Sequence, residues 1–105
     1  MAIGQTLAIA ISGVKANALR ANVAANNIVN ASTPDFKSSQ VRTTSLVTSP
    51  LEPGGGVLAQ LIGGGEVDVA TEFIRLIEAD IAYRANIKTI QTVEGIETEV
   101  IDILA

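Results

Sequence analysis

Residues 68–104 carry apolar side chains on more than one side of a single long helix, and no other feature limits the possible folds as strongly. The periodicity is helical throughout, Asp68 fits an N-cap, and the predicted helix is about 55 Å long at about 1.5 Å per residue. A partner helix can cover one side, where the residues expected to pair are Phe73, Leu76, Tyr83, Ile87 and Ile90. The other side has to meet a second surface, a subunit interface formed by Ile74, Ile81, Ala85, Ile96, Val100 and Ile103.

The amino-terminal segment predicts the partner helix, over residues 4–30. Its apolar and small residues recur at alternating steps of four and three, which is the heptad spacing of a helix that packs along another helix. Pro34 ends this helix, because proline lacks an amide donor and disfavours helical angles at Thr33. The residues expected to pair with the second helix are Leu7, Ile11, Val14, Ala18, Ala21, Ala25 and Ile28.

The middle of the chain, residues 31–66, connects the two helices. Six of the nine glycines lie here, together with Pro50 and Pro53. Turn chemistry at residues 50–55 leaves two alternatives, a short β-hairpin within 41–62 or a linker without regular structure. The sequence therefore predicts one mainly α-helical domain over 1–105, in which two long antiparallel helices form a helical hairpin or coiled coil.

Burial of apolar surface decides whether such a hairpin can be stable alone. Two paired helices leave much of their surface exposed to water. Each Ile, Val or Leu that stays in water forgoes about 1.5–3 kcal/mol of burial free energy. Half a dozen such residues amount to about the whole stability of a small domain, about 5–15 kcal/mol. We therefore expect the chain to fold as part of an oligomer or polymer.

Composition excludes most kinds of catalytic and ligand site. The 105 residues include no cysteine and no histidine, so no catalytic, metal or cofactor site is expected. A net charge of −4, with one Tyr and two Phe, argues against nucleic acid as a partner. Two helices offer no cleft for hydrolytic chemistry. The acidic residues near the C-terminus are instead expected to form a solvated edge or a charge contact between subunits. They are Glu94, Glu97, Glu99 and Asp102. The protein is predicted not to be an enzyme.

Membrane insertion and a cleaved signal peptide are not expected either. No run reaches the length of about eighteen apolar residues that a membrane span needs. The first residues carry no basic side chain, and Gln5 and Thr6 interrupt their apolar run, which is unlike a secretory signal.

Two stretches carry a family resemblance. Residues 19–41, LRANVAANNIVNASTPDFKSSQV, resemble the N-terminal signature of the flagellar rod and hook (axial) proteins. Residues 67–104, beginning VDVATEFIRLIEADIAYRAN, are similar to the C-terminal signature of the same family. The motif positions in the first stretch are Asn26, Asn27, Asn30, Thr33, Pro34, Phe36 and Lys37.

The resemblance implies a structural subunit of the flagellar basal-body rod. In that family the terminal helices pair, line a tubular filament and polymerise into the axial structure that spans the periplasm. Its subunits pass through the flagellar export apparatus without a cleaved signal. The implied partners are the protein itself and other rod or basal-body proteins. The short middle segment favours a small proximal-rod type, and the alternative is a self-assembling helical subunit of another appendage or secretion apparatus.

Two single positions and one row of asparagines carry further expectations. Asp35 stands where the family usually has glycine, and we expect the turn after Pro34 to survive because Asp tolerates positive φ. Gly95 interrupts the second helix, which predicts a kink or a close helix crossing. Asn22, Asn26 and Asn30 form one row on the first helix, either an amide interface with a neighbouring subunit or the linker, or a solvated helix edge.

Overall fold

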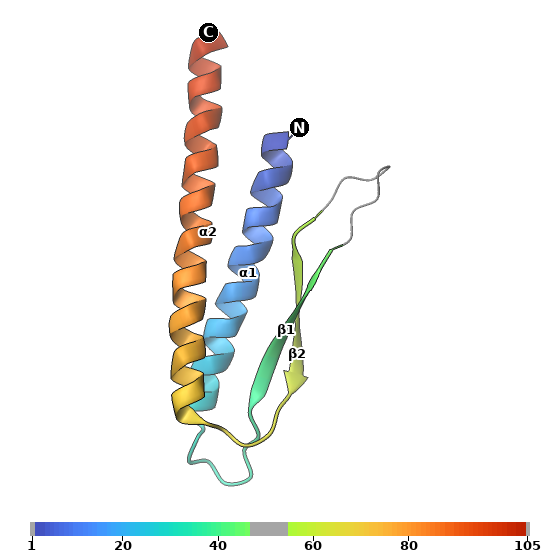
Figure 1. The fold of residues 1–105 in the computed structure, drawn as a ribbon, viewed down its shortest axis with the longest axis vertical. Helices are drawn as coiled ribbons and strands as arrows, with labels where there is room; N and C mark the ends of the chain where they lie inside the picture. The colour runs from blue at the N-terminus through green and yellow to red at the C-terminus, as the bar shows by residue number, and fades with distance from the viewer. Residues whose placement is uncertain (1, 47–54, 105) are drawn as a thin grey trace.

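The computed structural model describes residues 2–46 and 55–104, with side chains from residue 4 onward. The elements in chain order are helix α1 Ala2–Val29, strand β1 Ser39–Ser45, strand β2 Val57–Gly63 and helix α2 Val69–Leu104 (Figure 1). The predicted fold class is confirmed, because two long antiparallel helices dominate and the linker contains a β-hairpin. The predicted turn at 50–55 lies largely outside the described residues.

Helix α2 begins where the sequence supplies a cap. The Asp68 carboxylate accepts a hydrogen bond from the Thr71 N–H at 3.4 Å, and the Asp68 carbonyl accepts one from the Glu72 N–H at 2.9 Å. The first bond satisfies an amide group that the first turn of a helix leaves without a partner, and the second is the first backbone bond of the helix. The helix continues through Gly95, where a Cβ would meet nothing within 4 Å, so the chain itself makes no close helix crossing there.

The hairpin depends on α1 for its position. Strands β1 and β2 pair antiparallel along their whole length, and a ribbon of two strands is only marginally stable alone. Toward the middle of α1, the Ser12 hydroxyl accepts a hydrogen bond from the Val57 N–H at 3.1 Å. Near the C-terminal end of α1, the Asn27 side chain bonds the backbone of Ser39. Two polar side chains of α1 therefore hold the hairpin at opposite ends.

The corner that follows α1 is a turn of four residues. The Thr33 carbonyl accepts a hydrogen bond from the Phe36 N–H at 3.2 Å, with Pro34 at the second position of the turn. Asp35 occupies the third position with a φ of 60°, which is the requirement of a type II turn. The expectation that Asp35 adopts the conformation usually given to glycine is confirmed.

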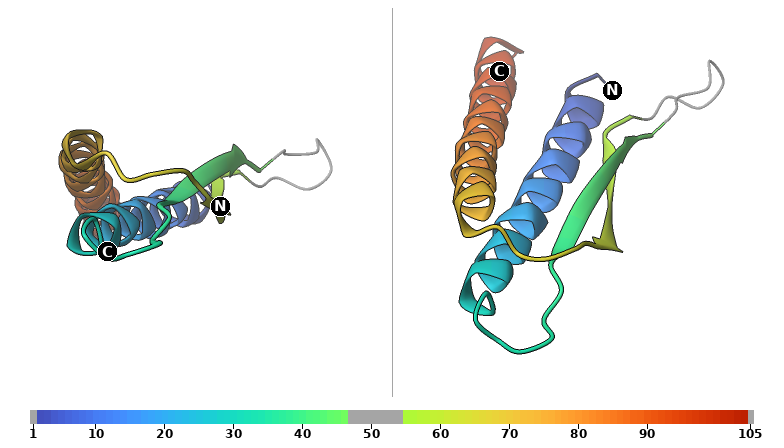
Figure 2. Two further views of the ribbon diagram at one scale, coloured as in Figure 1. Left: turned by 90° about the horizontal axis from the view of Figure 1, so that it is seen from below. Right: turned by 60° about the horizontal axis from the view of Figure 1, so that its bottom comes forward.

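Helix α1 lies between α2 and the hairpin, and the three elements enclose no common core (Figures 1 and 2). The chain measures 62 × 29 × 14 Å and has a radius of gyration of 17.6 Å, against about 13 Å for a compact domain of this size. Among the described residues, the buried hydrophobic ones are all alanines: Ala10, Ala16, Ala24 and Ala79. The single chain is therefore an open arrangement that buries no large apolar side chain within its described part.

The C-terminal end of α2 extends past the start of α1 (Figure 1). Ile101 is 59% exposed there and Leu104 is 80% exposed, because no element of the chain lies beside them. Neither described helix has the length of apolar, weakly charged sequence that a transmembrane span requires.

Candidate subunit interface

Small and polar residues form the contact between α1 and α2. Gly13, Asn17 and Ala24 follow one another at helical spacing along one side of α1, and both Asn17 and Ala24 are buried. A Cβ at Gly13 would come within 2.9 Å of the amide group of Asn86 on α2. The two helices therefore approach closely along this row, with Ala79 buried on the α2 side.

The α1 residues predicted to pair with the second helix lie on the flank of this row, one position further along the chain. Ile11 is 40% exposed, and half-buried positions are found at Leu7, Val14, Ala18, Ala21, Ala25 and Ile28. On α2, Phe73 is 49% and Tyr83 37% exposed, and half-buried positions are found at Leu76, Ile87 and Ile90. None of these twelve residues is buried in the single chain, and their pairing between the two helices stays a prediction.

A groove of about 370 Å³ lies where α1, α2 and β1 meet. Its floor on α1 includes Arg20, whose guanidinium donates a hydrogen bond to the Thr43 hydroxyl at 2.8 Å. Its α2 wall includes Glu72 and Arg75, which form an ion pair at 2.8 Å. No buried side-chain nitrogen or oxygen in the described part of the chain lacks a hydrogen-bond partner.

Glu72 is the one buried acidic residue among those described, and the sequence analysis did not single it out. Its side chain is 4% exposed, whereas that of its partner Arg75 is 45% exposed. The first turn of a helix favours a carboxylate because the helix dipole is positive there. The available signal was an acidic residue in a first turn, followed by an arginine three residues later.

Asn27 is the most deeply buried member of the asparagine motif, with an exposed fraction of 0%. Its amide group bonds both backbone groups of Ser39 and therefore belongs to the interior of the single chain. Asn22 and Asn26, by contrast, are exposed.

The other motif residues form a network at the end of α1. The Asn30 amide donates to the carbonyl and the side-chain oxygen of Asn26, both at 2.9 Å, and the Thr33 hydroxyl donates to the Asn30 side-chain oxygen at 3.2 Å. Phe36 is half-buried, while Pro34 and Lys37 are exposed. One of these bonds is to a backbone carbonyl of the last helical turn, that of Asn26, and the other two join side chains.

The residues predicted to form the subunit interface are all exposed in the single chain. Ile74 is 57% exposed, Ile81 62% and Ile103 82%, and the remaining three are Ala85, Ile96 and Val100. Ile77, which the sequence analysis did not include, is 57% exposed between Ile74 and Ile81. This outward face of α2 is a continuous apolar surface over its first turns.

Two sequence families match the chain. The family described as "Flagella basal body rod protein" matches residues 7–37, and the family described as "Flagellar basal body rod FlgEFG protein C-terminal" matches residues 65–103. Together they cover about two thirds of the chain, one at each end. The chain belongs to the flagellar basal-body rod family. No curated protein gives a significant match.

Family membership gives the chain a structural role in the flagellar basal body, with other basal-body rod proteins as partners. Within the described residues, no three acidic side chains come together in a group that could hold a metal ion. The fold of this rod-family chain presents apolar faces, a row of small residues and paired charges.

Proposed function

We propose that this rod-family protein is a subunit that polymerises through the exposed faces of its terminal helices into the periplasm-spanning rod. One observation carries the proposal: the buried hydrophobic residues of the described chain are all alanines, while the large apolar residues on the outward side of α2, such as Ile74, Ile77 and Ile81, are exposed to solvent. Ile81 is 62% exposed and Ile103 is 82% exposed on the side turned away from α1. A neighbouring subunit would bury these side chains.

The energy of this burial is large for so small a chain. The six α2 residues named for the interface are about half exposed on average, and covering them would contribute about 1 kcal/mol each, or about 6 kcal/mol in total. The total is comparable with the whole stability of a small domain. Assembly would therefore supply the apolar core that the single chain lacks.

The resemblance to axial proteins supports the finer parts of the proposal. Copies of this chain and other rod proteins are its proposed neighbours. Transport through the flagellar export apparatus without a cleaved signal is the proposed route to the periplasm. The described part of the connection between the helices forms a short hairpin, and the connection spans only residues 31–66, which supports a proximal position in the rod.

The experiment replaces Ile81 and Val100 with Asp and follows assembly by sedimentation and by co-purification with basal bodies. We expect the variant to lose both assembly and co-purification with basal bodies, while its helical circular dichroism stays unchanged. The reason is that an Asp introduced on this face cannot be buried against a neighbour. Gln91→Asp, at an exposed position of the same helix, is the matched control and should leave both measurements unchanged. Equal behaviour of the two variants would contradict the proposal.

A further inference from the structure

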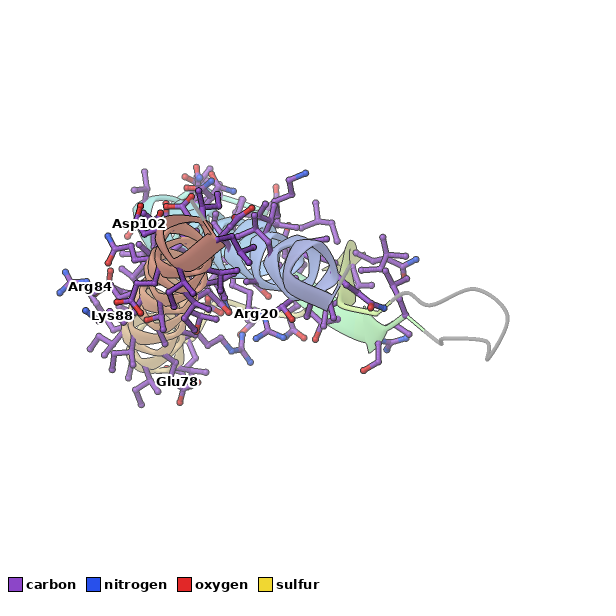
Figure 3. All side chains as sticks on the ribbon, turned by 90° about the horizontal axis from the view of Figure 1, so that it is seen from above. Arg20, Glu78, Arg84, Lys88 and Asp102 are labelled. Carbon is purple, nitrogen blue, oxygen red and sulfur yellow. The ribbon has the colours of Figure 1, made fainter. Side chains whose placement is uncertain are left out.

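The outward side of α2 has a lower face that combines apolar and basic residues. Ile74, Ile77, Ile81, Arg84 and Lys88 follow one another at steps of three or four, and we call this set the lower face. Its three isoleucines are 57–62% exposed. Figure 3 shows Arg84 and Lys88 on the side of α2 that is turned away from α1.

The charges of the lower face are available to a partner. Arg84 contacts Asp80 at 3.3 Å, but the side chains of the pair are 78% and 53% exposed, and such surface pairs are weak. Lys88 is exposed and takes part in no ion pair among the described residues. The guanidinium of Arg84 has five N–H donors and the ammonium of Lys88 has three, so both side chains can donate hydrogen bonds to further carboxylates.

The far end of the same helix has the opposite charge. Ile96, Glu99, Val100, Asp102 and Ile103 are exposed on its last turns, and we call this set the tip. After Lys88 the sequence contains four acidic residues and no basic one. The last turn of α2 carries no basic side chain, although the negative end of the helix dipole favours one there. The charge of the tip is therefore unbalanced within its own chain.

We propose that the tip of α2 in one copy packs on the lower face of α2 in a second copy, with the two helices parallel and staggered. This inference rests on the proposed polymerisation and names the surfaces that carry it. Isoleucine and valine meet isoleucine at the centre of the contact. Asp102 lies nearly level with Arg84, Lys88 extends toward Asp102 from about 8 Å further along the axis, and Glu99 lies about 6 Å along the axis from Arg84. The centres of the two surfaces lie about 19 residues apart on one helix, so the stagger is about 28 Å.

A second copy is the occupant that the charges indicate, because each copy supplies both complementary halves. The tip and the lower face are different surfaces, so their contact is heterologous and leaves one of each free at the ends of every assembly. Such a contact adds copies in a row instead of closing a dimer. A filament-forming protein needs this property.

The test exploits the separation of charge with two variants of the full chain. One variant carries Arg84→Glu and Lys88→Glu, and the other carries Glu99→Lys and Asp102→Lys. Each alone brings like charges together and should raise the concentration for half-assembly about tenfold or more. An equimolar mixture should restore assembly, because each variant then finds its opposite charge on the other. Circular dichroism of each variant reports whether α2 still forms.

Each outcome in sedimentation decides a different point. If the unaltered chain assembles and either variant assembles equally well, or if the mixture fails to assemble, this contact is overturned while polymerisation stands. If the unaltered chain forms only a closed dimer at every concentration, the parallel stagger is overturned. If it remains a monomer at all concentrations, self-polymerisation itself fails, and the contact between copies fails with it.

Discussion

The side chain of Asn27 makes two hydrogen bonds with the backbone of Ser39. It accepts one from the Ser39 N–H at 3.0 Å and donates one to the Ser39 carbonyl at 2.8 Å. The amide group thus replaces a neighbouring strand at the start of β1 and satisfies two backbone groups that would otherwise need another partner. Through this contact the end of α1 fixes where the hairpin begins.

Replacing Asn27 with Ala should lower the free energy of unfolding by about 2–4 kcal/mol, because two backbone groups at a part-buried site lose their partners. Denaturant titration measures the loss, and hydrogen exchange should show faster exchange in β1 and β2. Asn26→Ala is the matched control: Asn26 is exposed, and its side chain bonds only that of Asn30. The control should change stability by no more than about 0.5 kcal/mol. Similar losses for the two variants would contradict the role assigned to Asn27.

Replacing Arg75 with Ala should cost more than replacing Arg84 with Ala. Removal of Arg75 leaves the buried Glu72 carboxylate without its ion-pair partner, which should cost about 1–3 kcal/mol, since Arg75 itself is half exposed to solvent. Arg84 pairs with an exposed Asp80 at similar spacing and should contribute about 0.5 kcal/mol or less. Thermal unfolding of the two variants in parallel measures the difference. A larger loss for Arg84→Ala would show that burial of Glu72 is not what decides the outcome.

Replacing Gly56 with Ala should detach the end of the hairpin nearest Ser12. Gly56 has a φ of 102°, which costs an L-residue about 1–3 kcal/mol. An added Cβ would also overlap the Ser12 hydroxyl, which accepts the Val57 N–H. Hydrogen exchange at Val57 should therefore accelerate. Gly65→Ala, where an added Cβ meets nothing within 4 Å, should leave that amide protected, and equal exchange in the two variants would contradict the prediction.

The sequence predicted the elements better than the contacts between them. Helical periodicity, the Asp68 cap and the Pro34 stop place both helices correctly because they act within a few residues. The row that joins the helices could not be found in the same way. The residues expected to pair, alanines among them, lie one position further along α1 than Gly13, Asn17 and Ala24, and their pairing with α2 stays a prediction.

The asparagine motif shows where local pattern is insufficient. Asn26 and Asn27 are neighbours of the same type, yet one is exposed and the other is completely buried. Their difference follows from the path of the chain after the turn, which brings Ser39 back beside Asn27. The outward apolar face of α2 was predictable because it needs only the spacing of residues on one helix.

Replacing Gly95 with Ala should stabilise the single chain, because Gly95 lies inside α2 and an added Cβ would meet nothing within 4 Å. Alanine is preferred to glycine by about 1 kcal/mol within a helix, which corresponds to a rise in Tm of about 4–8 °C. Gly13→Ala is the matched comparison. Alanine is again preferred in the helix, but the added Cβ would lie 2.9 Å from the Asn86 amide group, which opposes the gain. Its gain should be smaller or negative in the same circular dichroism melt. Equal gains at both positions would mean that the Asn86 side chain moves aside without cost, and the contact of Gly13 with Asn86 would then not determine the separation of α1 and α2.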